Sequence, residues 1–477
     1  MARKGIEGGS YKPLDEEDIA RIHDTVMRVF EEVGIRVNSA EALDYFRKGG
    51  ATVEDGIVKM PRDMVMELVG KAPSEVILYG RDPEHNLNLG DARVYAGTGG
   101  TALHIIDGIT GSRRKATLED LKNLARLVDG LENIHFFLLP TYPTELQPEG
   151  VDVNRFFAGL DNTSKHIMGG VYTYEGLDNV IRMGSIIAGS EEKLREEPIL
   201  SIIMCAISPM NIDEKYGDMI ITAAQAGIPV ALPAEPLCGS TSPVTVAGNV
   251  VIQTVDSLAE VCLSQLVNPG TPAIFGSVAS SNDFQSFKYL IGAIEMGMSN
   301  AASAQMAQFY KLPFYATAGM SDSKVVDAQC GYESALTTLL CALSGANYIH
   351  DAAGLLDFAL SVSFEKYVMD DEIIGMAMRA VEGIAVNEDT LAFDLIKKVG
   401  PGGNFVTAKH TRKYMRTEHY MPSLSDREHL EAWRDNGSQD TAHRAKARAE
   451  QILAESRYSL PADVRQQILN EIPNIID

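Results

Sequence analysis

A repeated alternation of short apolar runs with helical stretches constrains the fold of this 477-residue chain more than any other feature. Strands that alternate with helices form parallel sheets, because each helix carries the chain back across the sheet. Runs of this kind follow one another between residues 93 and 352, and we predict a strand at each. They are Arg93–Gly97, Ile134–Leu139, Ile167–Val171, Leu200–Ile207, Pro229–Pro233, Ala273–Val278, Phe314–Ala318 and Tyr348–Ala352.

Segments with the helical period lie between these runs. They include Leu118–Val128, Leu177–Ala188, Tyr216–Ala226, Ala247–Asn268, Ile294–Tyr310 and Tyr332–Ser344. Eight β/α units over roughly 260 residues match the usual size of a (β/α)8 or TIM barrel. An open, doubly wound sheet is the competing architecture, but no Gly-x-Gly-x-x-Gly opens a helix after an early strand. We therefore predict an α/β protein with a (β/α)8 barrel over residues 91–400.

The flanking segments do not continue the β/α rhythm. Residues 1–90 combine a helical pattern from about Leu14 to Val37 with a second helix near residues 61–69 and a short strand near residues 76–79, which predicts an N-terminal helical cap. Residues 401–477 follow a sharp chain reversal, Gly400–Phe405, and carry a polar helical tail from about residue 426 to 455. We predict a C-terminal helical extension, which solvation or packing in a homo-oligomer explains.

Composition excludes several classes of function. The net charge of −23 repels phosphate backbones, so no nucleic-acid partner is expected. Five cysteines, widely spaced, indicate reduced thiols, and no familiar spacing of zinc ligands occurs, so no metal site is expected. No leader of signal-peptide type and no unbroken apolar stretch of about 18 residues is present, which predicts a cytoplasmic protein without a membrane partner.

Barrel enzymes hold their sites at the carboxyl ends of the strands, so the residues after each predicted strand were the candidates. No Ser or Cys nucleophile with an adjacent base can be read there. Several tyrosines do converge, and aromatic faces attract quaternary ammonium groups. The strand-end residues are Tyr95, Thr98, Tyr142, Tyr172, Tyr174, Ser208, Asn211, Glu235, Ser280–Asp283, Ser321, Asp322, His350 and Asp351.

Two titratable residues at these strand ends have open interpretations. Glu235 lies between two prolines after an apolar run, where it either holds a cation or substrate or satisfies loop amides. His350 lies inside an apolar run beside Asp351, and is either a site residue or a satisfied core histidine. The segment Gly97–Gly100 is likewise either a tight turn or a backbone surface that a ligand approaches closely.

Two long segments resemble signature segments of the trimethylamine methyltransferase family. The first is Ser321–Glu333, with the sequence SDSKVVDAQCGYE, and the second is Gly400–Phe405 with His410 and Thr411. Val33–Val37 and Gly97–Gly100 also fit, so the resemblance covers nearly the whole chain. It implies a methyltransferase that uses a partner corrinoid protein.

The resemblance also places an ordinary residue, Val325, where the archaeal trimethylamine enzymes of the family carry pyrrolysine. Members without pyrrolysine include glycine betaine, proline betaine and carnitine methyltransferases. A quaternary ammonium loses a methyl group to leave a neutral amine, whereas trimethylamine must first be made cationic. We therefore expect a quaternary amine as substrate, with glycine betaine first. No cofactor is expected on the chain itself, because cob(I)alamin comes with the corrinoid protein.

Individual roles are expectations from position. Val325, Glu235 and His350 are expected at the reacting centre. The expected substrate-binding residues are Tyr95, Gly97, Gly99, Gly100, Tyr172, Tyr174, Asn282, Asp322, Tyr332 and Glu333. Two alternatives stay open at this point. One is a betaine-binding module without catalysis, and the other is a barrel lyase that uses Lys324 as a Schiff-base lysine.

Overall fold

The N-terminal segment packs helices and a small sheet beside the main body. The computed structural model describes residues 5–456 and 458–476. Helix α1 (Glu16–Arg28) begins at a capping box formed by Asp15 and Asp18, and α2 (Ala40–Lys48) begins at Ser39. The predicted second helix and short strand are present as α3 (Arg62–Val69) and β5 (Val76–Leu78). A small sheet, β3 (Thr52–Glu54), β4 (Ile57–Lys59) and β2 (Ile35–Val37), continues into β13 (Asn211–Ile212).

The predicted strands form one sheet at the centre of the molecule, and the α/β prediction is confirmed. Within the described residues the sheet has the order β1-β7-β20-β19-β16-β14-β12-β11-β10. Every neighbouring pair from β7 to β10 is parallel, and only β1 (Ile6–Glu7) runs antiparallel, beside β7. The parallel strands are β7 (Arg93–Thr98), β10 (Phe137–Leu138), β11 (Ile167–Gly169), β12 (Leu200–Ile203), β14 (Val230–Ala234), β16 (Ala273–Ser277), β19 (Phe314–Thr317) and β20 (Tyr348–Ala353).

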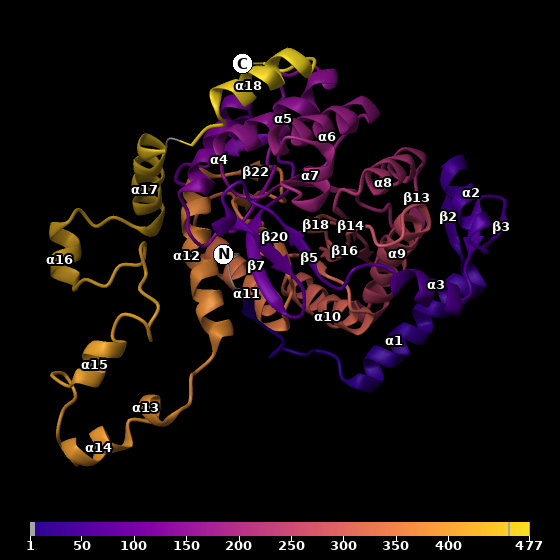
Figure 1. The fold of residues 1–477 in the computed structure, drawn as a ribbon. Coiled ribbons are helices and arrows are strands. Elements are labelled where there is room, and N and C mark those ends of the chain that lie inside the picture. Colours follow the sequence, from indigo (N-terminus) through magenta and orange to yellow (C-terminus); the bar gives the residue numbers. More distant parts are fainter. Residues whose placement is uncertain (1–4, 457, 477) are drawn as a thin grey trace.

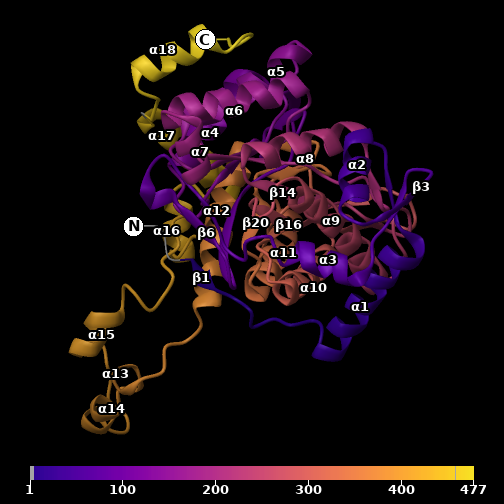
Figure 2. The ribbon, with the colours of Figure 1, turned by 45° about the vertical axis from the view of Figure 1, so that its right-hand side comes forward.

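Helices follow the parallel strands along the chain and surround the sheet in both views (Figure 1, Figure 2). They are α4 (Leu118–Asp129), α5 (Pro148–Asn162), α6 (Tyr174–Ala188), α8 (Glu214–Ala226), α9 (Val246–Val267), α10 (Ile294–Tyr310), α11 (Ala328–Ser344) and α12 (Phe364–Glu382). Each helix that the sequence predicted between residues 118 and 344 is present. The helical pattern predicted from about Leu14 to Val37 ends earlier, because Ile35–Val37 form strand β2. Helix α9 is long and apolar enough to span a membrane, but 83% of its most apolar window is buried, as in a core helix.

The two ends of the parallel row lie together. The backbone N–H of His135, just before β10, donates to the carbonyl of Ala96 in β7 at 2.8 Å. The hydroxyl of Thr98 donates to the carbonyl of Leu138 at 2.6 Å. First and last strands of the row are therefore neighbours, although no strand ladder joins them in the sheet order.

An apolar cluster gathers side chains from strands all along this row, and we call it the inner cluster. The hairpin of β5 and β6 (Leu87–Leu89) packs against it. Phe136 and Tyr348 stack at its centre with ring centroids 3.5 Å apart. Its members are Val76, Leu78, Leu87, Leu89, Tyr95, Phe136, Leu138, Met168, Ala231, Ile274, Tyr315 and Tyr348.

The C-terminal part leaves the body after α12 and returns to it. The short helices α13 (Glu388–Leu391), α14 (Phe393–Val399) and α15 (Lys409–Tyr414) stand away from the other helices in both views (Figure 1, Figure 2). Helix α17 (Thr441–Glu455) packs against α12 and α4, and α18 (Ala462–Glu471) packs against α6. The predicted boundary at residue 400 falls inside the projecting segment.

Candidate functional site

Glu235 is the carboxylate at the centre of the candidate site. It follows β14 directly and its side chain is exposed to solvent, yet desolvation by the surrounding protein raises its pKa. Glu235 is therefore closely surrounded by other residues, while part of its side chain still reaches solvent. Asp351 raises its pKa further and His350 lowers it, so both lie within electrostatic reach.

Tyr289 is the direct partner of Glu235. Its hydroxyl donates a hydrogen bond to the carboxylate, which lowers the pKa of Glu235 and partly offsets the desolvation. Burial and the nearby Glu235 raise the pKa of Tyr289 well above its ordinary value. Tyr289 is half-buried on the two-residue strand β18 (Tyr289–Leu290). We call Cys205, Glu235, Tyr289, His350 and Asp351 the strand-end cluster.

Cys205 completes this cluster from the loop after β12. It is half-buried, and desolvation, with Glu235 as the next cause, raises the pKa of its thiol well above the usual range. Such a thiol stays protonated and is a poor nucleophile. The structure therefore agrees with the sequence in offering no activated cysteine at this point.

His350 and Asp351 lie at the end of β20 in a distorted part of the strand. His350 Nε2 is 2.8 Å from Asp351 Oδ2, and His350 Nδ1 is 2.8 Å from the carbonyl of Ala316. Both ring nitrogens therefore face oxygen atoms. Thr317 adds a hydroxyl 2.9 Å from Nδ1. His350 is 4% exposed, so this arrangement is fixed by packing.

Asp351 has a strained backbone for a residue with a side chain, with φ of 61°. The pairing of β20 with β7 is irregular between Ile349 and Ala353, as at a β-bulge. Its Oδ1 has no hydrogen-bond partner among the described residues, and it lies 2.1 Å from the position a Cβ would take at Gly99. Gly99 is therefore required to let this carboxylate reach its position.

The two other glycines of the segment also allow close packing. A Cβ at Gly97 would lie 2.4 Å from the ring of Phe136. Gly100 has φ of +83°, and a Cβ there would meet Leu355 at 2.8 Å. Tight packing alone explains both residues, and substrate binding by this segment stays a prediction.

Asp322 and Glu333 position the strand that carries Tyr289. Asp322 accepts hydrogen bonds from the backbone N–H groups of Ile291 and Gly292, each at 3.2 Å. Glu333 accepts from the hydroxyl of Ser321 at 2.6 Å and from the N–H of Asp322 at 2.9 Å. Both predicted residues thus act on the site through the backbone after Tyr289.

Asn282 holds the same region from its other side. Its amide donates to the carbonyl of Cys238 at 3.2 Å and to the hydroxyl of Ser240 at 3.0 Å. It belongs to β17 (Ser280–Asn282), which pairs with β18 and with β15 (Leu237–Cys238). This small sheet joins the loop after Glu235 to the segment that bears Tyr289.

The predicted tyrosines do not form one group. Tyr95 is buried in the inner cluster, where its hydroxyl accepts from the N–H of Asn88 at 3.2 Å. Tyr172 is half-buried after β11, in edge contact with Tyr142 at 5.6 Å. Tyr174 is 48% exposed and its hydroxyl donates to Asp218 at 3.2 Å. Tyr172 and Tyr142 contact each other, whereas the contacts of Tyr95 and Tyr174 are with other residues.

The residues of the signature segment lie between β19 and the first turns of α11. Val325 is half-buried, with its side chain 3.4 Å from the Cβ position at Gly111. Lys324 is exposed, and its ammonium lies 4.2 Å from the ring centroid of Phe358. Tyr332 is 55% exposed on α11. None of these contacts connects Val325 or Tyr332 to Glu235, and their expected roles stay predictions.

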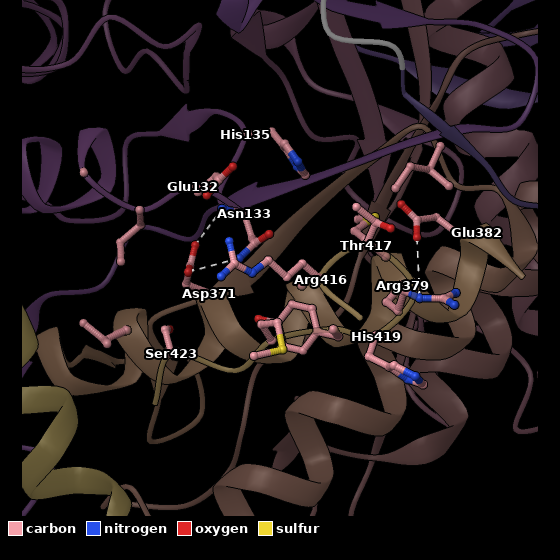
Figure 3. Close-up of a pocket in the computed structure, with 18 of the residues that line it drawn as sticks. Glu132, Asn133, His135, Asp371, Arg379, Glu382, Arg416, Thr417, His419 and Ser423 are labelled. Atoms are coloured by element: carbon pink, nitrogen blue, oxygen red, sulfur yellow. Dashed lines mark hydrogen bonds and ion pairs between the residues drawn. The ribbon is translucent and has the colours of Figure 1, made fainter. Parts of the chain in front are cut away.

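A separate cavity has no lining residue in common with the strand-end cluster. It has a volume of about 700 Å³ and is lined by the segment before β10, by α12 and by the returning segment 416–423. Figure 3 shows its polar side chains, among them Asp371, which accepts from the N–H of Asn133 at 2.7 Å. Because the segment before β10 marks the amino ends of the parallel strands, this cavity lies at the opposite end of the strands from Glu235.

Residues 5–456 and 458–476 contain no group of three His, Cys, Asp or Glu side chains arranged to hold a metal ion.

The family model for trimethylamine methyltransferases matches residues 4–473 of the sequence. The chain belongs to the trimethylamine methyltransferase family. The resemblance inferred from the signature segments is therefore confirmed, and the methyltransferase class with it.

Members of the trimethylamine methyltransferase family match the chain over nearly its whole length. The glycine betaine methyltransferase of Desulfitobacterium hafniense strain Y51 is 37% identical over 95% of this chain and 94% of its own. The trimethylamine methyltransferase MttB of D. hafniense strain DCB-2 is 37% identical over 99% and 95%. The protein of that name from Methanosarcina thermophila is 34% identical over 94% of both chains.

Tyr289 and Cys205 were not found from the sequence. Tyr289 lies in a polar segment 54 positions after Glu235, outside every predicted strand. Its signal was a single aromatic residue near the end of a polar loop that follows a predicted strand. Such a residue gives no period, and only the fold shows that it faces Glu235.

Proposed function

We propose that this protein transfers a methyl group from a quaternary amine, with glycine betaine as first choice, to the cob(I)alamin of a partner corrinoid protein. Proline betaine and carnitine are the other candidates. The observation that carries the proposal is the strand-end cluster. There the accessible carboxylate of Glu235 accepts a hydrogen bond from the hydroxyl of an aromatic residue, Tyr289. This combination suits a small organic cation. The 37% identity to a glycine betaine methyltransferase supports the choice.

The proposed scaffold is a (β/α)8 barrel with the N-terminal segment and the C-terminal extension attached to it. Support comes from the 2.8 Å hydrogen bond between His135 and Ala96, which joins the two ends of the parallel row. The inner cluster receives side chains from β7 and β10 as well as from strands between them, as the filled interior of a barrel does. The strand-end cluster then lies at the barrel mouth.

The proposed reaction needs little chemistry from the chain. One C–N bond of the ammonium group breaks, its electron pair stays on nitrogen, and a neutral tertiary amine leaves. The corrinoid supplies the nucleophile for the methyl group. Because no proton is needed by the leaving amine, the chain has to desolvate the cation, hold it and aim one methyl group. No metal ion on the chain is required.

Glu235 and Tyr289 are assigned to the cation in this proposal. The carboxylate attracts the positive charge, and the ring adds about 0.5–2 kcal/mol if a face is presented. The carboxylate of a betaine is assigned to the polar groups around His350, whose Nε2 lies 2.8 Å from Asp351. Tyr172 and Tyr142 extend the aromatic wall from β11 and β10.

Trimethylamine is expected to be a much poorer substrate than a quaternary amine. Val325, an ordinary side chain, provides no group that forms an adduct with a neutral amine. Neutral trimethylamine without such an adduct would have to expel an amide-like anion, which is a poor leaving group. The protein is therefore expected to work on amines that are already quaternary, in the cytoplasm together with its corrinoid partner.

The test is a panel of glycine betaine, proline betaine, carnitine and trimethylamine with reduced corrinoid, followed by the visible spectrum of the cobalt. At least one quaternary amine should be demethylated to its dimethyl product, and trimethylamine should be at least about a thousandfold slower, which corresponds to about 4 kcal/mol. Trimethylamine reacting as fast as every quaternary amine would overturn the proposal. Tight betaine binding without transfer would favour a binding module, and borohydride trapping at Lys324 a Schiff-base lyase.

A further inference from the structure

Helix α5 directs two buried side chains of opposite charge toward the carboxyl ends of β10 and β11. The helix lies beside α4 and α6 in both views (Figure 1, Figure 2). Asp152 and Arg155 are three residues apart on it, so they share one face of the helix. Arg155 is fully buried and Asp152 is 1% exposed. Neither of them belongs to the strand-end cluster.

Arg155 binds backbone carbonyl groups at these strand ends. Its Nη2 donates to the carbonyl of Leu139 at 3.0 Å, and its Nε donates to that of Thr141 at 3.0 Å, just after β10. Its Nη1 donates to the carbonyl of Gly170 at 3.2 Å, just after β11. Because the donors of a guanidinium lie in one rigid plane, Arg155 sets the positions of these carbonyls relative to one another.

Asp152 binds N–H groups of the segment that follows Gly170. Its carboxylate accepts from the backbone N–H groups of Tyr172 and Thr173, each at 3.0 Å, and from the hydroxyl of Thr173 at 2.9 Å. Burial raises the pKa of Asp152, and these hydrogen bonds and the nearby Arg155 oppose that shift. One acceptor and one donor on α5 thus hold both kinds of backbone group between Gly170 and Thr173.

The segments held in this way carry the aromatic pair Tyr142 and Tyr172. Tyr142 follows Thr141, whose carbonyl binds Arg155, and the N–H of Tyr172 binds Asp152. The two rings are in edge contact at 5.6 Å, and the guanidinium of Arg155 lies 5.5 Å from the ring centroid of Tyr172. The pairing of β10 with β11 ends before either tyrosine. The position of both rings therefore depends on α5 as well as on the sheet.

We propose that Asp152 and Arg155 are positioning residues for the substrate cation, and that they act by holding the rings of Tyr142 and Tyr172 in place. This inference rests on the proposed function, in which these rings belong to the aromatic wall around a quaternary ammonium. The attraction between a ring and a cation depends on their distance and orientation. Loosening this clamp should therefore weaken binding of the cation, although no group that touches the substrate is removed.

The test begins with the binding of glycine betaine to the full-length protein, measured by calorimetry without a corrinoid protein. D152N keeps the size of the side chain and removes its charge and one acceptor, and the dissociation constant should rise about 10-fold. R155K keeps the positive charge but cannot bind three carbonyls in one plane, so an equal rise would report geometry and not charge. In methyl transfer, KM should follow the dissociation constant while kcat changes less than about threefold.

A double-mutant cycle with Tyr172→Leu separates positioning of the ring from general damage to the fold. Tyr172→Leu alone should raise the dissociation constant about 10-fold. In that background D152N and R155K should each add less than about twofold, because the ring on which they act is gone. Independent effects that multiply would overturn the proposal, and so would unchanged binding in both single variants. If R155K fails to fold, D152N decides the outcome, because Asp152 contacts the backbone of Tyr172 itself.

Glu372 on α12 provides the matched control. It is 3% exposed and accepts from the backbone N–H groups of Ser423 at 2.8 Å and Ser425 at 2.9 Å, so it is a buried carboxylate that holds a chain segment, as Asp152 is. E372Q should lower the melting temperature, as D152N does, and leave the dissociation constant of glycine betaine unchanged. Equal weakening of binding by E372Q would show that the effect of D152N is general, and would contradict the proposal.

The results also separate this inference from the proposed function. If the binding cycle gives the expected coupling but the wild-type protein transfers no methyl group to cob(I)alamin, the positioning role stands and the proposed function fails. If transfer occurs and the cycle shows independent effects, the positioning role is wrong and the proposed function stands. A wild-type protein that binds neither glycine betaine nor tetramethylammonium would overturn both.

Discussion

The inner cluster and the strand-end cluster share the same strands but differ in chemistry. A stack of rings connects them: Phe136 lies on Tyr348 at 3.5 Å, Tyr348 faces Tyr315 at 5.5 Å, and Tyr315 faces His350 at 4.1 Å. Below His350 the members are apolar or aromatic, and burial raises the pKa of Tyr315 and Tyr348 far above the usual range. From His350 upward the members are titratable.

The comparison assigns different functions to neighbouring parts of the same strands. The inner cluster stabilises the fold, and the strand-end cluster is the proposed binding site. The hairpin of β5 and β6 packs on the inner cluster, so its rings are dry and cannot hold a soluble substrate. Glu235 has the opposite situation, since it is both desolvated and accessible. Substitutions in the two layers should therefore change different measured quantities.

The largest effect is expected from Phe136→Ala in the inner cluster. It removes a ring that stacks on Tyr348 and fills the space beside Gly97, so the free energy of unfolding should fall by about 3–5 kcal/mol. Urea unfolding measures this change. Phe309→Ala, at a ring that is 43% exposed, is the control and should cost much less. If Phe136→Ala keeps full stability but abolishes methyl transfer, the two layers do not differ as described.

A smaller effect, on activity alone, is expected from Glu235→Gln. Without the carboxylate the cation loses its counter-charge, and kcat/KM should fall about 100-fold, which corresponds to about 3 kcal/mol. The carboxylate forms only above the raised pKa of Glu235, so wild-type kcat/KM should rise with pH through that pKa. This rise should be absent in the variant. The exposed Glu295→Gln is the control, and a pH profile that Glu235→Gln leaves unchanged would assign the titration to another group.

A modest effect is expected from Tyr289→Phe. The hydroxyl of Tyr289 lowers the pKa of Glu235, so its removal should shift the rising limb of the pH profile to higher pH. The ring remains, and the loss at neutral pH should be about 1 kcal/mol, or several-fold in kcat/KM. Tyr45→Phe, on α2, serves as control. An unshifted limb would show that Tyr289 does not contact Glu235 in solution.

No effect at all is expected from chelation. Neither the proposed reaction nor the strand-end cluster uses a metal ion on the chain. Transfer rates should be equal before and after prolonged dialysis against a chelator, measured with the same corrinoid. If chelation abolished methyl transfer and zinc alone restored it, the assignment of substrate binding to the aromatic and carboxylate groups of the strand-end cluster would be wrong.

Periodicity was sufficient for the elements that pack regularly. The helix predicted over residues 294–310 has those bounds in the structure, and the first parallel strand differs from its prediction by one residue. The strand predicted to Ile207 ends at Ile203. Asp256 on α9 accepts from Ser208 and Met210, 48 and 46 positions away, and so holds the following loop. A contact between residues so far apart in the sequence cannot be predicted from the local hydrophobic pattern.

The candidate site was predictable only in part. Glu235 and His350 were selected because they follow predicted strands, and the structure brings them within electrostatic reach of each other, while their roles stay predictions. Tyr95 lies in the inner cluster, and β7 is buried from Val94 to Thr98, so alternation along the strand does not separate the inner cluster from the strand end. The structure shows why glycine is needed at positions 97, 99 and 100: a Cβ there would meet Phe136, Asp351 and Leu355, respectively. These contacts cannot be predicted from the neighbouring sequence.

The order of the strands has a consequence for synthesis of the chain. One edge of β7 is paired by β1, which leaves the ribosome first, but its other edge waits for β20, roughly 250 residues later. At about 5–20 residues per second this edge is unpaired for tens of seconds. An open edge is a site for wrong pairing with other chains. Truncation before residue 348 should therefore yield aggregates, and a nascent chain stalled there should need a chaperone.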